Sequence, residues 1–145
     1  MQNLIVVVCV GLMGGVAVGL QDPLSSMMGE RLGTLESVFI VHFGGTVLSL
    51  LPLLALGGGN LAKWQSVPWY ALGAGALGVV FISALSYAIP RIGVTATVTL
   101  VIAGQLVLGV IVDHFGLLGA KVNPLDIMRI IGVIVVFIGA WLVVR

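Results

Sequence analysis

The chain has 145 residues, of which 60% are hydrophobic and 8% are charged, and its mean hydropathy is +1.27. Soluble domains carry about 25% charged residues, so the composition excludes a water-soluble protein and predicts an integral membrane protein in a lipid bilayer. The net charge of +1 argues against a nucleic-acid partner, and two histidines with one cysteine cannot assemble a catalytic triad or a metal-ligand cluster. We therefore expect no enzyme, no cofactor and no metal.

Five long uncharged stretches divide the chain, at 1–21, 37–62, 64–90, 92–112 and 130–144. Each approaches the roughly 20 residues that a helix needs to cross about 30 Å of hydrocarbon. We predict one all-α transmembrane domain, 1–145, with helices at about 3–31, 34–56, 67–89, 93–115 and 124–144.

Five crossings distribute the six Lys and Arg residues evenly between the two sides of the membrane. One side receives Lys63, Lys121 and Arg129, and the other receives Arg31, Arg91 and Arg145. An excess of Lys and Arg in cytoplasmic loops normally sets the orientation, and here neither side has one. A chain without this bias can insert either way up, so we predict dual topology and an antiparallel homodimer, the two-chain version of an inverted-repeat transporter.

The helix predicted over 3–31 carries a face of small residues, Gly11, Gly15 and Gly19. Small residues let a second backbone approach closely, where lipid offers no hydrophobic driving force for packing. We expect this face to contact either another helix of the same chain or a second chain.

Polar residues follow at Gln21 and Asp22, directly before Pro23. Proline cannot donate a backbone hydrogen bond, so it frees the carbonyl near Gly19. We predict one long helix kinked at Pro23, with a polar binding spot where the freed carbonyl lies beside Gln21 and Asp22. In the alternative, the helix ends here and Asp22 caps the segment that follows.

His42 lies about 12 Å into the helix predicted over 34–56, at 1.5 Å per residue. Thr46 and Ser49 follow at helical spacing, so the three side chains share one face. Polar side chains at this depth normally face the protein interior or a water-filled cavity. We expect His42 either to carry protons near neutral pH or to form an interhelical hydrogen bond, and we place Thr46 beside it as a substrate-binding candidate.

Boundary signals frame two of the other helices. Pro90 is expected to end the helix over 67–89, because a proline cannot continue the hydrogen-bond ladder. Asn123 is the expected N-cap of the last helix, 124–144.

The helix predicted over 93–115 has the strongest polar pattern. Gln105, Gly109 and Asp113 recur every four residues and fall within about 80° of one another around the helix. Gly109 clears space between two polar side chains, which suits a ligand or a close helix. We take Gln105 and Gly109 as substrate-binding candidates, whereas Asp113 either lines the same cavity or reaches water at the membrane surface.

Several stretches resemble a known family pattern: Gly93-Val94-Thr95-Ala96-Thr97, Ala103-Gly104-Gln105-Leu106, then Gly109, Asp113 and Phe115, and the ending Gly139-Ala140-Trp141-Leu142-Val143. Together they resemble the YdcZ-like five-helix family of the drug/metabolite transporter superfamily, over essentially the whole chain. The resemblance implies a multi-pass transporter of the bacterial inner (plasma) membrane. It also implies that five-helix members pair antiparallel, with themselves or with a paralogous five-helix chain, and that longer relatives contain two fused units.

A weaker likeness joins the first helix to the small multidrug resistance transporters of the same superfamily. Ser25-Ser26-Met27-Met28 is similar to the hydroxyl-plus-apolar run that follows their membrane-embedded glutamate, and Gln21 occupies the place of that glutamate. Glutamine carries no charge and exchanges no proton, so this chain departs from proton-coupled drug export at that position. Asp22 is adjacent, but one residue along a helix is turned about 100° away.

Three functions fit these features. We expect a transporter that moves a small neutral or cationic solute by alternating access, because the candidates Gln21, Asp22, His42 and Gln105 include no Lys or Arg to receive an anion. A passive ion or solute channel and a non-transporting membrane subunit are the alternatives. Saturable uptake against a gradient would separate the transporter from the channel.

Overall fold

The structure is a computed structural model, and it describes residues 4–145. The predicted start of the first helix at residue 3 lies outside this range. Within it, five helical segments are long and apolar enough to cross a membrane, judged by length and composition. The backbone of such segments satisfies its own hydrogen bonds, which a bilayer requires because it contains no water to do so. The predicted all-α class with five apolar helices is therefore confirmed.

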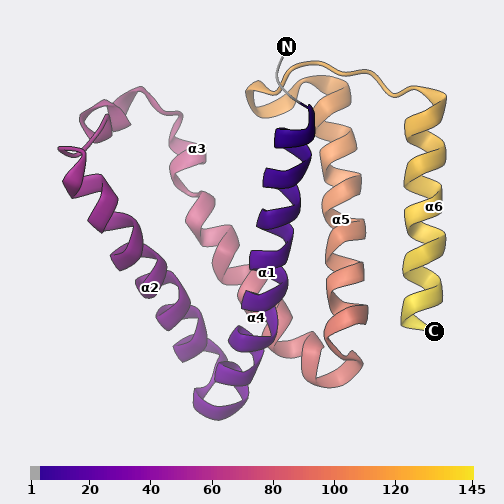
Figure 1. Cartoon of the computed structure of the whole chain (residues 1–145), viewed down its shortest axis with the longest axis horizontal. Coiled ribbons are helices and arrows are strands. Elements are labelled where there is room, and N and C mark those ends of the chain that lie inside the picture. The colour runs from indigo at the N-terminus through magenta and orange to yellow at the C-terminus, as the bar shows by residue number, and fades with distance from the viewer. Residues whose placement is uncertain (1–3) are drawn as a thin grey trace. The chain divides into compact units, whose positions relative to one another are not determined.

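The chain divides into two compact units, Met1–Pro90 and Arg91–Arg145, and each is described by itself. The first contains α1 (Leu4–Leu32), α2 (Thr34–Ala55), the 3-10 helix η1 (Leu61–Ser66), α3 (Trp69–Leu72) and α4 (Ala74–Ile92), whose last two residues belong to the second unit. The second contains α5 (Val94–Phe115), the 3-10 helix η2 (Leu117–Gly119) and α6 (Ile127–Val144) (Figure 1). The predicted single domain stays a prediction.

Single glycines make two of the helix connections. Gly33, with φ of 114°, joins α1 to α2, and Gly93, with φ of 82°, joins α4 to α5. Residues with a side chain rarely adopt such positive φ values, so glycine is the residue that these turns need. Each carbonyl also accepts the first backbone bond of the next helix, from Ser37 N at 3.1 Å and from Thr97 N at 3.2 Å.

Two prolines lie within helices. α1 continues through Pro23, so the helix is long, as predicted, and Asp22 caps no new segment. α4 runs through Pro90 to Ile92, beyond the predicted end at 89. Pro90 removes one hydrogen bond close to the helix end, where the cost is small, and Gly93 then turns the chain.

Two helix starts also differ from the expected positions. The segment predicted over 67–89 is divided at Gly73 into the short α3 and the longer α4. α6 begins at Ile127 instead of near residue 124, because Asp126, not Asn123, is its N-cap. The Asp126 carboxylate accepts a hydrogen bond from Arg129 N at 2.8 Å, which satisfies one of the free amides of the first turn.

Most large apolar side chains of residues 4–145 lie on the outside, as expected for a surface that lipid or another helix covers. The buried apolar side chains are few: Val38, Ile82, Leu85, Ile89, Ala96, Ala103 and Ala140. Buried polar side chains are nearly as numerous: Asp22, Ser25, Ser26, Ser37, Ser86 and Thr97. The interior of the first unit is therefore unusually polar for its size, whereas the buried residues described in the second unit are three alanines and Thr97.

Candidate functional site

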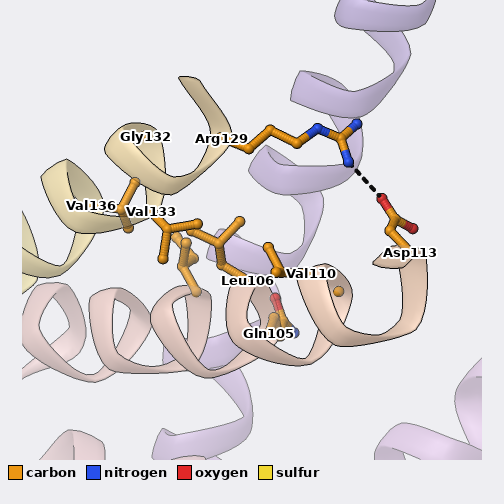
Figure 2. A pocket seen from close by; sticks show the side chains of 10 residues that line it. Gln105, Leu106, Val110, Asp113, Arg129, Gly132, Val133 and Val136 are labelled. Carbon is orange, nitrogen blue, oxygen red and sulfur yellow. Dashed lines mark ion pairs between the residues drawn. The ribbon is translucent and has the colours of Figure 1, made fainter. Parts of the chain in front are cut away.

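An open groove of about 660 Å³ lies along α5 and α6, which pack against each other in the second unit. One face of α5 contributes Ile102, Gln105, Leu106, Gly109, Val110 and Asp113. α6 contributes Arg129, Gly132, Val133 and Val136 (Figure 2). Most of these side chains are aliphatic. The groove is therefore largely apolar, and its polar side chains are Gln105, Asp113 and Arg129.

An ion pair lies at one end of the groove. Arg129 Nη1 lies 3.7 Å from Asp113 Oδ2 (Figure 2), with 35% and 47% of the two side chains exposed. The same Nη1 donates to the carbonyl of Asn123 at 3.2 Å, and Asn123 N donates to the carbonyl of Asp113 at 2.8 Å. The connection between α5 and α6 is therefore tied to both helices at the groove end.

Gln105 lies further along the groove wall, two helical turns before Asp113. Its side chain is exposed, and within residues 4–145 no described hydrogen bond engages its amide. Gly109 lies between the two, and a Cβ added there would have no atom within 4 Å. The Gln105 amide, with two donors and an acceptor, is thus a polar group of the groove lining next to the open space at Gly109.

The structure places Gln105, Gly109 and Asp113 along one groove, in agreement with their helical spacing. Asp113 lines this groove, and 47% of its side chain is exposed. Arg129 is the charged groove residue that the sequence did not indicate, since it was expected only to contribute a loop charge. The available signal was that Arg129 carries the opposite charge to Asp113 and lies near the start of the next helix.

A second polar group of side chains, here named the polar cluster, lies in the first unit. Its members are almost completely buried: Asp22, Ser25 and Ser26 of α1, Ser37 of α2 and Ser86 of α4. Ser37 Oγ donates to the carbonyl of Ser25 at 2.7 Å and so joins α2 to α1. Ser86 lies directly against Gly29 of α1, where an added Cβ would be 2.9 Å from Ser86 Oγ.

His42 makes local contacts. Its Nδ1 lies 2.8 Å from the carbonyl of Val38, and its Nε2 would be 2.6 Å from a Cβ added at Gly78 of α4. The ring therefore packs into the space that Gly78 leaves. Thr46 is exposed, and its hydroxyl donates to the carbonyl of His42 at 2.8 Å.

The six predicted binding residues lie in different units. Gln21, Asp22, His42 and Thr46 belong to the first unit, whereas Gln105 and Gly109 belong to the second. Gln21 is exposed and its neighbour Asp22 is buried, so the two face opposite environments. Their assignment to one binding site stays a prediction. Over the described range, no three His, Cys, Asp or Glu side chains gather in a way that would hold a metal ion.

The fold has five helices long and apolar enough to cross a membrane, and the groove between α5 and α6 is lined mostly by aliphatic side chains. The model of the family described as "Putative inner membrane exporter, YdcZ" matches residues 6–142. This match spans almost the whole chain, so the chain belongs to that family, as the resemblance implied. The family description names an exporter and no enzymatic activity.

A curated relative supports the same placement. The "Inner membrane protein YdcZ" of Escherichia coli (strain K12) is 35% identical over 81 residues, which are 56% of this chain and 54% of that protein. The chain thus spans about half the length of the curated relative that it matches. No solved structure gives a significant match. The chain is accordingly a multi-pass protein of the bacterial inner membrane.

Proposed function

We propose that this chain is a subunit of a secondary transporter that moves a small neutral or cationic solute by alternating access. The exporter description of its family supports a transport function. The observation that supports a site is the groove of about 660 Å³, which is lined by the exposed Gln105 and has open space beside it at Gly109. Ligand pockets are typically apolar with a few fixed polar groups, and this groove has that composition.

The charge of the groove supports the solute class. Among the described residues that line it, Arg129 is the one basic side chain, and it is paired with Asp113 at 3.7 Å. A pair of opposite charges leaves no net positive charge for an anion. An unpaired amide in an apolar wall instead favours a solute with its own donor or acceptor, because leaving the amide without a partner costs about 1–3 kcal/mol.

The proposed functional form is an antiparallel dimer, made of two copies or of this chain with a paralogous five-helix chain. The even division of Lys and Arg supports both orientations. The small-residue face of α1 supports close pairing, since a Cβ added at Gly11, Gly15 or Gly19 would meet no described atom within 4 Å. In such a pair, rocking about inverted halves would open the site to each side in turn.

The test is uptake into proteoliposomes that contain only this chain. Tetraphenylphosphonium, a lipophilic monovalent cation, and a panel of uncharged metabolites serve as probes. We expect saturable uptake against a concentration gradient for at least one probe. Gln105→Leu removes the amide at similar volume, so uptake should fall about tenfold, the equivalent of one hydrogen bond of about 1.4 kcal/mol, while the elution volume of the dimer is unchanged.

Gln65→Leu is the matched control, because Gln65 lies in η1 of the other unit, outside the groove. It should transport at the rate of the unsubstituted chain. Uptake that rises linearly with concentration would support the channel, and no uptake of any probe would support the non-transporting subunit. Dissociation of the Gln105→Leu dimer would show that Gln105 packs helices together and binds no solute.

A further inference from the structure

The connection between α5 and α6 returns along the end of α5 and is bonded to it. Two backbone N–H groups of the segment 122–125 donate to the last turn of α5. Asn123 N donates to the carbonyl of Asp113 at 2.8 Å, and Leu125 N donates to the ring nitrogen His114 Nδ1 at 3.2 Å. The segment is therefore held by one backbone acceptor and by one side-chain acceptor.

The turn after α5 allows this close return. Gly116 has φ of 62°, a left-handed conformation that favours glycine. A Cβ added at Gly116 would lie 2.6 Å from Val122 Cγ2, so the Val122 side chain packs over the place that a larger residue would fill. Pro124 has no N–H, which leaves the amides of Asn123 and Leu125 on either side of it to bond to α5.

The bond to His114 differs from the other because its acceptor can be titrated. A ring nitrogen accepts a hydrogen bond only when it carries no proton, so the bond from Leu125 N requires an unprotonated Nδ1. Histidine ordinarily changes charge between pH 5 and 8, whereas the carbonyl that accepts from Asn123 N does not titrate in this range. A proton added at Nδ1 therefore removes the bond to Leu125 and leaves the bond from Asn123 in place.

The charges near His114 balance one another. Four charged side chains lie on this end of α5 and on the connection and helix that follow it: Asp113 of α5, Lys121 of the connection, and Asp126 and Arg129 at the α6 start. The other charged residues of the second unit lie at the opposite ends of the two helices: Arg91 and Arg145. Protonation of His114 thus adds one net positive charge to a group of two acidic and two basic side chains.

The same segment contacts the charged end of the groove. Arg129 Nη1 donates to the carbonyl of Asn123 at 3.2 Å and lies 3.7 Å from Asp113 Oδ2. Asp113 and Arg129 both line the groove. Since Leu125 lies two residues after Asn123, the loss of its bond leaves the segment with fewer ties to α5. The position of Arg129 in the groove is then less restrained.

We propose that His114 is a pH-sensitive latch: its neutral ring holds the α5–α6 connection against the end of α5, and its protonation releases the connection. The latched state requires an unprotonated Nδ1, so it is present at the upper end of the histidine range and is lost as the pH falls.

The latch stands by itself, whereas its effect on solute movement rests on the proposed transport function. In that function, acid loosens the groove at Arg129 and so eases the entry or exit of solute. In an antiparallel dimer the two copies present this connection to opposite compartments, so acid on one side acts on one copy alone.

The experiment measures hydrogen exchange of the Leu125 amide by NMR, in the purified full chain in detergent micelles and without any solute. Each rate is compared with that of an unstructured peptide at the same pH, because exchange itself is catalysed by hydroxide. We expect the protection of Leu125 to fall about tenfold from pH 8 to pH 5, as the loss of one hydrogen bond predicts. The amide of Gly116, which donates to the Val112 carbonyl, should keep its protection.

Two substitutions of His114 separate a latch from a purely structural role. His114→Asn places an amide oxygen near the position of Nδ1 and does not titrate, so Leu125 should stay protected at both pH values. His114→Phe keeps a ring but supplies no acceptor, so protection should be about tenfold lower at both. His42→Gln is the control, because it removes the other histidine, which lies in the first unit, and it should keep the pH response.

Equal protection of Leu125 at pH 5 and pH 8 overturns the proposal, as does a pH response that survives in both His114 variants or disappears in His42→Gln. An equal loss of protection at Gly116 also overturns it, because the end of α5 then unfolds as a whole. If a His114 variant does not fold, the remaining variant and the His42→Gln chain decide. Since no solute is present, a failure here leaves the uptake test unaffected.

Discussion

At the scale of single residues, one glycine sets how closely α1 and α4 approach. A Cβ at Gly29 would lie 2.9 Å from Ser86 Oγ and 3.0 Å from Ser86 Cβ. The hydroxyl can rotate away, but the Cβ moves only with the α4 backbone. Gly29 therefore keeps Ser86 within the polar cluster, and its place cannot be taken by alanine without separating the two helices.

We predict that Gly29→Ala destabilises the chain although alanine favours helix. Replacing a helical glycine contributes about 0.5–1 kcal/mol of stability, whereas overpacking costs about 1–3 kcal/mol, so the net loss is about 1 kcal/mol. The measurement is the unfolding midpoint in detergent.

Gly14→Ala provides the comparison on the same helix, since a Cβ there would meet no described atom within 4 Å. This variant should be as stable as the unsubstituted chain or slightly more so. If Gly29→Ala behaves like Gly14→Ala, the close approach of α1 and α4 is wrong.

The sequence does not predict which side of α1 is buried. Gln21 and Asp22 are adjacent, and one is exposed while the other is 1% exposed. In a soluble protein the apolar face would reveal which side is buried. In α1 the residues around the helix are apolar on every side, and lipid is as apolar as the protein interior, so no such face exists.

At the scale of elements, helix spans were predictable and helix ends were not. Long apolar runs with charged borders locate α1, α2, α5 and α6 to within a few residues. Spacing alone also placed Gln105, Gly109 and Asp113 on one face, which is a property of any helix. The pairing of Asp113 with Arg129 depends instead on the path of the connection between α5 and α6, which no local pattern encodes.

The start of α6 illustrates this limit. Asn123 and Asp126 are both good N-cap residues by type, and the structure selects Asp126. The backbone of Asn123 is engaged elsewhere, because its N–H donates to Asp113 and its carbonyl accepts from Arg129. These contacts hold Asn123 at the end of α5, so the helix can begin only after it.

We predict that Asp126→Ala destabilises the second unit by about 1 kcal/mol, the usual effect of losing an N-cap side chain. The cause is the loss of the 2.8 Å bond to Arg129 N. Hydrogen exchange of the first amides of α6 measures it directly, as faster exchange at and after Ile127.

Asn123→Ala tests the alternative cap. The described contacts of Asn123 use its backbone N–H and carbonyl alone, and alanine keeps both. Exchange at the start of α6 should therefore be unchanged. If Asp126→Ala and Asn123→Ala increased the exchange rate at the start of α6 equally, Asn123 would also act as a cap.

At the scale of the whole molecule, the balance of charges decides how the chain enters the membrane. Lys63, Lys121 and Arg129 lie at one side of the predicted crossings, and Arg31, Arg91 and Arg145 lie at the other. Arg129 forms an ion pair with Asp113. Arg129 still counts in full, because the number of Lys and Arg residues on each side, and not the net charge, governs orientation. A change of one residue should thus tilt the balance.

We predict comparable populations in both orientations for the unsubstituted chain, detected by reporter proteins fused after Arg145. Lys63→Gln should shift the population so that the side holding Arg145 becomes mainly cytoplasmic, because that side then has the larger number of positive residues. Arg31→Gln should shift it the opposite way. A fusion found on a single side in the unsubstituted chain would contradict the homodimer and favour pairing with a second five-helix chain.

The single-glycine turns have one more consequence. In the predicted alternation of five crossings, Gly33 and Gly93 are expected at one membrane face and the longer connections at 56–68 and 116–126 at the other. Between its crossings, one face of the chain therefore shows almost no polypeptide to the aqueous compartment. Proteases and antibodies need several accessible residues, so among the connections between crossings we expect them to recognise only 56–68 and 116–126.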